Sequence, residues 1–218
     1  MLTRQAVLVA SVVLLVGAVY AAADEVCRLP IVNKQGFRPQ AVVAYTVDLA
    51  PGGRPFPSDK IKCVDRAFDA WTQANVRTGL QVRFVRGVGG IVVRFDRRGG
   101  LVLQRRTAGA WAEPVRSADG YLEQASIWLS ADPRLLTSCD GLTKVILHEL
   151  GHLHGLQDNA VYRGPSVMNR ASRRDDTGGR IPFAPTACDA AQARNASALL
   201  LARHEPLPTV PTGRDSPR

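Results

Sequence analysis

Two histidines and a glutamate at close spacing form the part of the chain best suited to chemistry. His148 and His152 stand four residues apart, and Glu149 lies between them. On a helix this spacing places both imidazoles on one face, close enough to hold one zinc ion. Glu149 would then reach a water molecule at the same ion and act as a general base. A pattern this short is only moderately specific, so the residues around it decide how it is interpreted.

The residues that follow strengthen the zinc prediction. Gly151 costs a helix ~1 kcal/mol relative to alanine, which suggests close packing beneath the site. Gly155 stands three residues after His152, where helices often end in a left-handed residue suited to glycine. A sharp turn there would bring Asp158 to the metal as a third ligand and leave a fourth position open for water. The alternative is an ordinary loop aspartate. His154 points away from the histidine face, and a packing or surface role is favoured over ligation.

The N-terminus has the organisation of a secretory signal peptide. Arg4 precedes an apolar stretch at 6–19, and three alanines at 21–23 resemble a cleavage site. We predict cleavage after Ala23, an uncleaved membrane anchor being the alternative. The mature protein is then expected to be secreted, extracellular or periplasmic, without stable membrane association. Residues 24–205 would form one domain, and the proline-rich tail at 206–218 is expected to be disordered.

Export indicates that the four cysteines form disulfides. An even number in an exported chain suggests two bridges, with three possible pairings. The pairing we favour joins Cys27 to Cys63 and Cys139 to Cys188. The second bridge would tie the start of the motif helix to a C-terminal helix. Because the chain has no Cys-x-x-Cys pair, a zinc site built from cysteines is not expected.

The overall charge is basic but dispersed. The chain of 218 residues has 28 lysines and arginines against 19 acidic residues, a formal charge of +9. No run of five or more basic residues occurs, so nucleic acid is not expected as a partner. A basic protein that binds anionic surfaces, with an accidental histidine motif, is a competing hypothesis. Nothing in the sequence suggests more than a monomer.

The periodicity of apolar residues predicts the elements that must position the motif. Residues 106–120 are expected to be irregular and residues 155–182 to form a loop. The mixture indicates one α+β domain, a twisted sheet backed by two helices. Strands are predicted at 41–47, 80–86, 91–95, 101–105 and 121–130, and helices at 59–78, 141–154 and 188–203.

The extended motif resembles the metzincin metallopeptidases. The segment HELGHLHGLQD at 148–158 is followed by SVMN at 166–169. Metzincins carry His-Glu-x-x-His-x-x-Gly-x-x-His and a methionine-containing turn below the metal, and Met168 matches that methionine. Asp158 stands where most of the family has a third histidine, and in this respect the chain is similar to the snapalysins. The stretches AVVAYTVD, AFDAWTQ and LQVRFVR also look like the first strand, first helix and second strand of matrixin-like domains.

Two features of the family are missing. No Pro-Arg-Cys-Gly switch precedes the domain, so latency through a cysteine is not expected. Arg170 stands two residues after Met168, where some metzincins have a tyrosine that binds zinc.

The resemblance implies a fold and an activity. The fold is a metzincin-like zincin domain, a mainly parallel sheet of about five strands with an antiparallel edge strand, backed by two helices and followed by a C-terminal helix. The activity is that of a zinc-dependent endopeptidase acting on peptide or protein substrates, with Glu149 as general base. YLEQASIWLS at 121–130 resembles the edge strand that borders the cleft, although an ordinary sheet strand is the alternative. The competing function is a catalytically weak or inactive zinc-binding module that binds a protein. Structural Ca²⁺ is possible, but no motif indicates it.

Overall fold

The chain folds as an α+β unit in the computed structural model. Among the described helices, none is long and apolar enough to cross a bilayer. The predicted signal peptide, the tail, the strand at 101–105 and Cys27 lie outside the described residues. The structure describes residues 35–48, 56–95, 110–130, 138–159, 164–169 and 181–204.

Within the described residues the sheet has five strands, in the order β2-β1-β3-β5-β4. Neighbouring strands run parallel except β4, which pairs antiparallel with β5 at one end of the sheet. The mainly parallel sheet with one antiparallel edge strand agrees with the coarse expectation. The strands are β1 (Val42–Val47), β2 (Arg83–Arg86), β3 (Ile91–Phe95), β4 (Ala110–Arg116) and β5 (Leu122–Leu129).

The identity of the antiparallel edge strand corrects the sequence prediction. Residues 121–130 were expected at the edge, but β5 lies inside the sheet between β3 and β4. Beyond β5 the last described strand is β4, within a stretch that was predicted to be irregular. Its apolar signal is weak because the inward-facing residues Ala110 and Ala112 are small. Pro114 also argues against a central strand, yet it is compatible with an edge, where no ladder partner needs its missing N–H.

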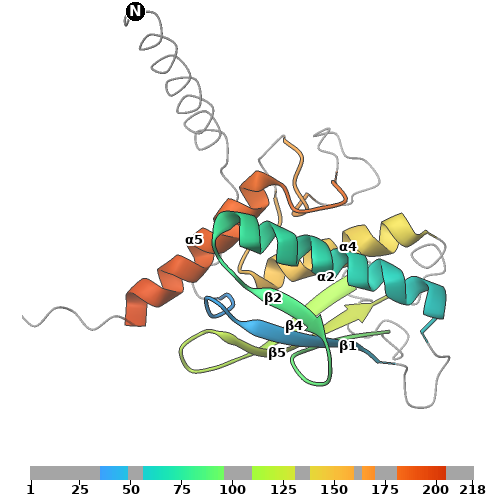
Figure 1. The fold of residues 1–218 in the computed structure, drawn as a ribbon, viewed down its shortest axis with the longest axis horizontal. Helices are drawn as coiled ribbons and strands as arrows, with labels where there is room; N and C mark the ends of the chain where they lie inside the picture. The colour runs from blue at the N-terminus through green and yellow to red at the C-terminus, as the bar shows by residue number, and fades with distance from the viewer. Residues whose placement is uncertain are drawn as a thin grey trace, which may run out of the picture.

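Three helices complete the described fold: α2 (Ser58–Thr78), α4 (Cys139–Leu153) and α5 (Ala187–His204). Figure 1 shows α2 and α4 on the same face of the sheet, with α5 crossing near the end of α4. Helix α2 buries a stripe that includes Val64, Phe68 and Trp71. The indole N–H of Trp71 donates to the carbonyl of Leu147 at 2.9 Å and so fixes α4 against α2.

The disulfide pairing also differs from the expectation. Cys63 in α2 is bonded to Cys139, the first residue of α4, with their Cα atoms 5.4 Å apart. Cys188 is disulfide-bonded as well. The predicted Cys27–Cys63 and Cys139–Cys188 pairs are therefore wrong. The reason is tertiary: α2 and α4 pack side by side, so residues 76 positions apart in sequence become neighbours.

Candidate metal centre

Helix α4 places the two histidines on the face opposite its packed side. The hydroxyl of Ser138 caps the helix by accepting the Gly141 N–H at 3.3 Å. Buried residues recur along α4 at helical spacing and anchor one face in the core: Leu142, Ile146, Leu147, Leu150 and Leu153. His148 and His152 lie on the other face and remain partly exposed, as the zinc motif requires.

The helix ends in a sharp turn at Gly155. Its φ of +87° is left-handed, as predicted. The Leu156 N–H donates to the Gly151 carbonyl and the Gly155 N–H to the His152 carbonyl, each at 3.0 Å. This is the Schellman arrangement, which closes a helix and reverses the chain. A Cβ at Gly155 would lie 2.3 Å from the carbonyl oxygen of Gln35, so both conformation and space require glycine.

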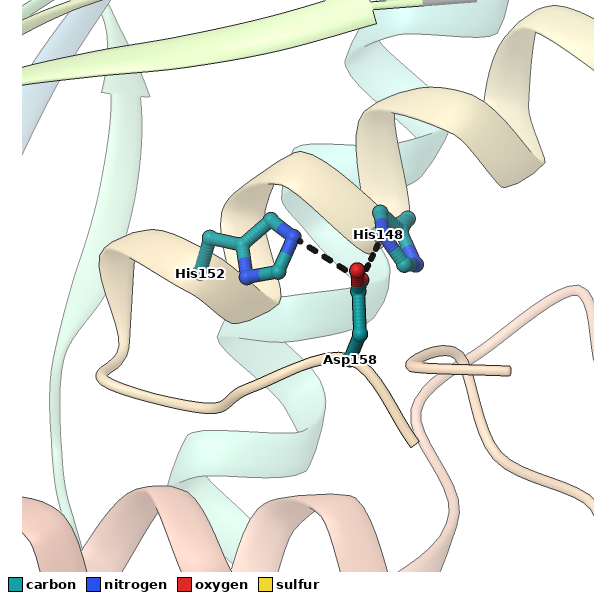
Figure 2. Close-up of side chains that lie close together, drawn as sticks. All are labelled: His148, His152 and Asp158. Carbon is teal, nitrogen blue, oxygen red and sulfur yellow. Dashed lines mark ion pairs between the residues drawn. The ribbon is translucent and has the colours of Figure 1, made fainter. Parts of the chain in front are cut away.

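The reversed chain brings Asp158 to the histidines. Its Oδ1 lies 3.1 Å from Nε2 of His148 and 3.4 Å from Nε2 of His152. Figure 2 shows the carboxylate between the two rings, arriving from the segment after α4. The three candidate ligand atoms all lie within 4.8 Å of one another. The structure thus brings together all three residues predicted as ligands.

Hydrogen bonds at Nδ1 orient both imidazole rings so that Nε2 faces the site. Nδ1 of His148 lies 2.8 Å from the carbonyl oxygen of Val167, and Nδ1 of His152 lies 2.9 Å from that of Leu156. A carbonyl only accepts, so each Nδ1 carries the proton. In the protonated ring Nε2 donates to Asp158; loss of that proton leaves the Nε2 lone pair facing the site, which is the form that binds a metal.

The donor set fits a zinc ion. Zinc–nitrogen and zinc–oxygen bonds of about 2.0–2.1 Å in tetrahedral geometry separate two ligand atoms by roughly 3.3 Å, close to the 3.1 and 3.4 Å that separate Asp158 from the rings. Hydrogen bonds from the two histidines hold the pKa of Asp158 below its usual range. Burial tends to lower the pKa of His152, but its bond to Asp158 and the charge of Glu149 outweigh burial and raise it.

Glu149 lies beside this cluster as a buried carboxylate. Only 5% of its surface is exposed. Burial raises its pKa, whereas the two histidines and a hydrogen bond from the Ala112 backbone lower it. Its Oε2 has no hydrogen-bond partner among the described residues. A buried acceptor without a partner is costly, and it is suited to hold a water or substrate proton next to the three ligands.

Met168 packs against α4 at Gly151. It is fully buried, and a Cβ at Gly151 would lie 2.2 Å from its sulfur, so the methionine fills the space that glycine leaves. The close packing predicted for Gly151 is therefore present. The Met168 carbonyl also accepts the Asn159 N–H at 2.8 Å, which fixes the residue after Asp158.

His154 has a packing role. It is 1% exposed and stacks on Trp71 with ring centroids 4.3 Å apart, while Phe37 meets it edge-on at 4.6 Å. Burial lowers its pKa to about 3, so the ring is neutral. Its Nε2 has no partner among the described residues, and His154 does not join the ligand cluster.

Sequence reasoning missed two residues that contact this region. The Ala112 backbone bonds to Glu149 from β4, a strand that the sequence did not reveal. Asp189 is fully buried in the first turn of α5 and bonds to Ser166 and Val167. The signal for Asp189 was the spacing Thr186-x-x-Asp189 before a helix, which is a capping pattern.

Known proteins show little similarity to this chain. No protein-family model and no curated protein matches the chain. Among solved structures, one similar chain belongs to a structure described as the GM1 bound form of the ECX AB5 holotoxin. The two chains share 15% sequence identity with a TM-score of 0.41, and the match covers 77% of this chain and 86% of the other. Similarity at this level carries no argument about function.

Proposed function

We propose that this chain is an exported zinc-dependent endopeptidase of the metzincin type. The observation that carries the proposal is the convergence of three ligand atoms, from His148, His152 and Asp158, beside a buried carboxylate. The mainly parallel sheet with an antiparallel edge strand and the methionine packed beneath the helix support the metzincin resemblance. The disulfide between Cys63 and Cys139 supports export to an oxidising compartment.

In the proposed hydrolysis, the metal and Glu149 would have different roles. A zinc ion held here would supply Lewis acidity, which polarises a carbonyl and lowers the pKa of a water to about 7. Glu149 is placed to accept the proton of that water through Oε2, since this oxygen has no partner among the described residues. The same carboxyl group would later return the proton to the leaving amine. The bond from the Ala112 backbone holds the carboxylate in one orientation meanwhile.

The outer edge of β4 is the proposed binding site for an extended substrate. In an antiparallel pair, successive residues turn their N–H and C=O groups alternately toward and away from the partner strand. Because the Ala112 N–H reaches Glu149, Ala112 faces away from β5, and so does Pro114 two residues later. A peptide could pair with this edge by adding a strand. The Ala112 N–H is already bonded to Glu149 and Pro114 has no N–H, so a peptide would pair with these two residues through their carbonyl groups.

A cleavage assay with a matched pair of variants tests the proposal. Purified protein is expected to contain one equivalent of zinc by elemental analysis and to cleave a denatured protein in a chelator-sensitive reaction. Glu149→Gln should keep the zinc and the fold but lose about 10²–10⁴-fold in activity, since it removes general-base catalysis. Glu123→Gln alters an exposed glutamate on β5 and should leave activity unchanged.

The outcomes separate the competing functions. Undiminished cleavage by Glu149→Gln would refute the assignment of Glu149, and cleavage that survives chelation would refute the dependence on zinc. Wild-type protein with bound zinc and no cleavage of any denatured substrate would favour the non-cleaving zinc module. Purified protein that contains no zinc would favour the third hypothesis, a basic protein that binds anionic surfaces.

A further inference from the structure

The proposed chemistry makes no use of Asp189, a fully buried carboxylate in the first turn of α5. Its two oxygens accept four hydrogen bonds. The Ser166 hydroxyl reaches Oδ1 at 2.5 Å and the Val167 N–H reaches Oδ2 at 3.2 Å. The N–H and hydroxyl of Thr186 reach Oδ2 at 2.8 and 2.7 Å. A charge buried to this degree is tolerated only when it is so fully bonded.

Half of these bonds have a local explanation. Thr186 caps α5 by accepting the Asp189 N–H at 3.1 Å, and Asp189 reaches back to the Thr186 N–H. This reciprocal pair is a capping box, which stabilises the start of a helix. It does not explain the bonds from Asp189 to Ser166 and Val167, which lie in the segment beneath the metal ligands.

The bonds to that segment continue to His148. The Ser166 Oγ that donates to Asp189 accepts the Met168 N–H at 3.0 Å. The peptide group that carries this N–H also carries the Val167 carbonyl, which accepts from Nδ1 of His148 at 2.8 Å. The donors therefore run in one direction, from the imidazole through a peptide group and a hydroxyl to the carboxylate.

We infer that Asp189 is a positioning residue for His148, acting through Ser166 and the peptide group between Val167 and Met168. Each bond in such a chain polarises the next, by perhaps 10–30% per bond. The buried charge at one end thus draws the Nδ1 proton toward the Val167 carbonyl and makes Nε2 more basic. A histidine ligand that donates directly to a carboxylate gains the same benefit. The link from Asp189 to metal affinity rests on the proposed function, whereas the hydrogen bonds from His148 to Asp189 can be tested on their own.

His152 provides an internal control. Its Nδ1 bonds to the Leu156 carbonyl at the end of α4 and not to the segment held by Asp189. A change at Asp189 or Ser166 should therefore affect His148 selectively, whereas a general loosening of the site would affect both rings.

The first test observes the two Nδ1 protons by NMR in metal-free, histidine-labelled full-length protein. Ser166→Ala and Asp189→Asn should each move the His148 proton upfield and speed its exchange, and leave the His152 proton in place. Thr186→Ala removes the helix cap but keeps Ser166 bonded to Asp189, so it should lower thermal stability without the selective shift. An unmoved His148 proton in Ser166→Ala, or equal shifts of both histidines, would overturn the inference.

The second test measures zinc affinity by competition with a chelating dye. Ser166→Ala should weaken zinc binding by about 10–100-fold, the usual effect of an outer-shell change. Thr186→Ala should weaken it by less than threefold, and an equal loss in the two variants would overturn the inference. If the wild-type protein bound no zinc but Ser166→Ala shifted only the His148 proton, the proposed function would be refuted and the inference supported. Zinc-dependent cleavage by the wild-type protein, with no selective His148 shift in Ser166→Ala, would support the proposed function and refute the inference.

Discussion

Replacing Gly151 with alanine tests the packing beneath the proposed metal site. A Cβ at this position would lie 2.2 Å from Sδ and 3.4 Å from Cε of Met168, and 3.6 Å from Cζ2 of Trp71. Heavy atoms pack best at about 3.5–4.0 Å, so the sulfur must withdraw by roughly 1.3 Å or more. Met168 and Trp71 are both fully buried, and a close-packed interior has little space to receive the displaced atoms.

A second glycine in α4 supplies the control. Alanine at Gly141 would find only the Ser138 side chain, at 3.7 and 4.0 Å, which is ordinary contact. Gly141→Ala should therefore gain up to ~1 kcal/mol from helix propensity. Gly151→Ala gains the same propensity but overpacks the core, at a cost of ~1–3 kcal/mol. Because the propensity gain is common to both, Gly151→Ala should be less stable than Gly141→Ala by about 1–3 kcal/mol.

Urea unfolding of chelator-treated protein with intact disulfides measures these differences, provided that the m-value stays constant. Met168→Ala alone should cost ~2–5 kcal/mol by opening a cavity. In the double variant the new methyl group enters that cavity, so the combined loss should be smaller than the sum. If Gly151→Ala stabilised the protein as much as Gly141→Ala, or if the double variant were simply additive, the proposed contact would be refuted.

Three further predictions concern other parts of the molecule. Asp158→Ala should weaken zinc binding by more than the ~10–100-fold typical of outer-shell changes; unchanged affinity in a dye competition would assign the third ligand elsewhere. Replacing Cys63 and Cys139 together by serine should cost about 4 kcal/mol in urea unfolding, given their separation of 76 residues; a loss below about 1 kcal/mol would contradict this. Burial and the hydrogen bond to Asp65 raise the pKa of Tyr45, so stability present below pH ~10 should be lost as the pH rises further. In Tyr45→Phe the urea midpoint should fall less steeply as the pH rises above ~10. An equally steep fall in the variant would contradict the role of Tyr45.

Local signals in the sequence were sufficient to predict the ligand cluster. His148 and His152 are neighbours through helical periodicity alone. Gly155 then sets the turn through a backbone conformation that other residues adopt only at a cost. Asp158 is only three residues further on, so one helix and one turn determine its position. The cluster of these three side chains could be predicted because each step depended on residues close together in sequence.

The features that were wrong or missed depend on long-range packing. The Cys63–Cys139 bond requires α2 and α4 to lie side by side, which spacing in the sequence does not reveal. Strand β4 is stabilised by pairing with β5 more than by its own composition, since it contains alanines and a proline. Asp189 could be expected to cap a helix, but its bonds to Ser166 and Val167 cross 22 positions or more.

The placement of Pro114 has a consequence for the behaviour of this protein in concentrated solution. A sheet edge that accepts a peptide can also accept the same edge of another molecule, which is a common start of aggregation. Among the β4 residues whose backbone groups face away from β5, the Ala112 N–H is already bonded to Glu149 and Pro114 has no N–H to donate. A short substrate needs only a few bonds, whereas two full-length edges need a continuous row. Under the proposed function, Pro114 would allow a short peptide to pair with β4 while it discourages pairing between copies of the chain.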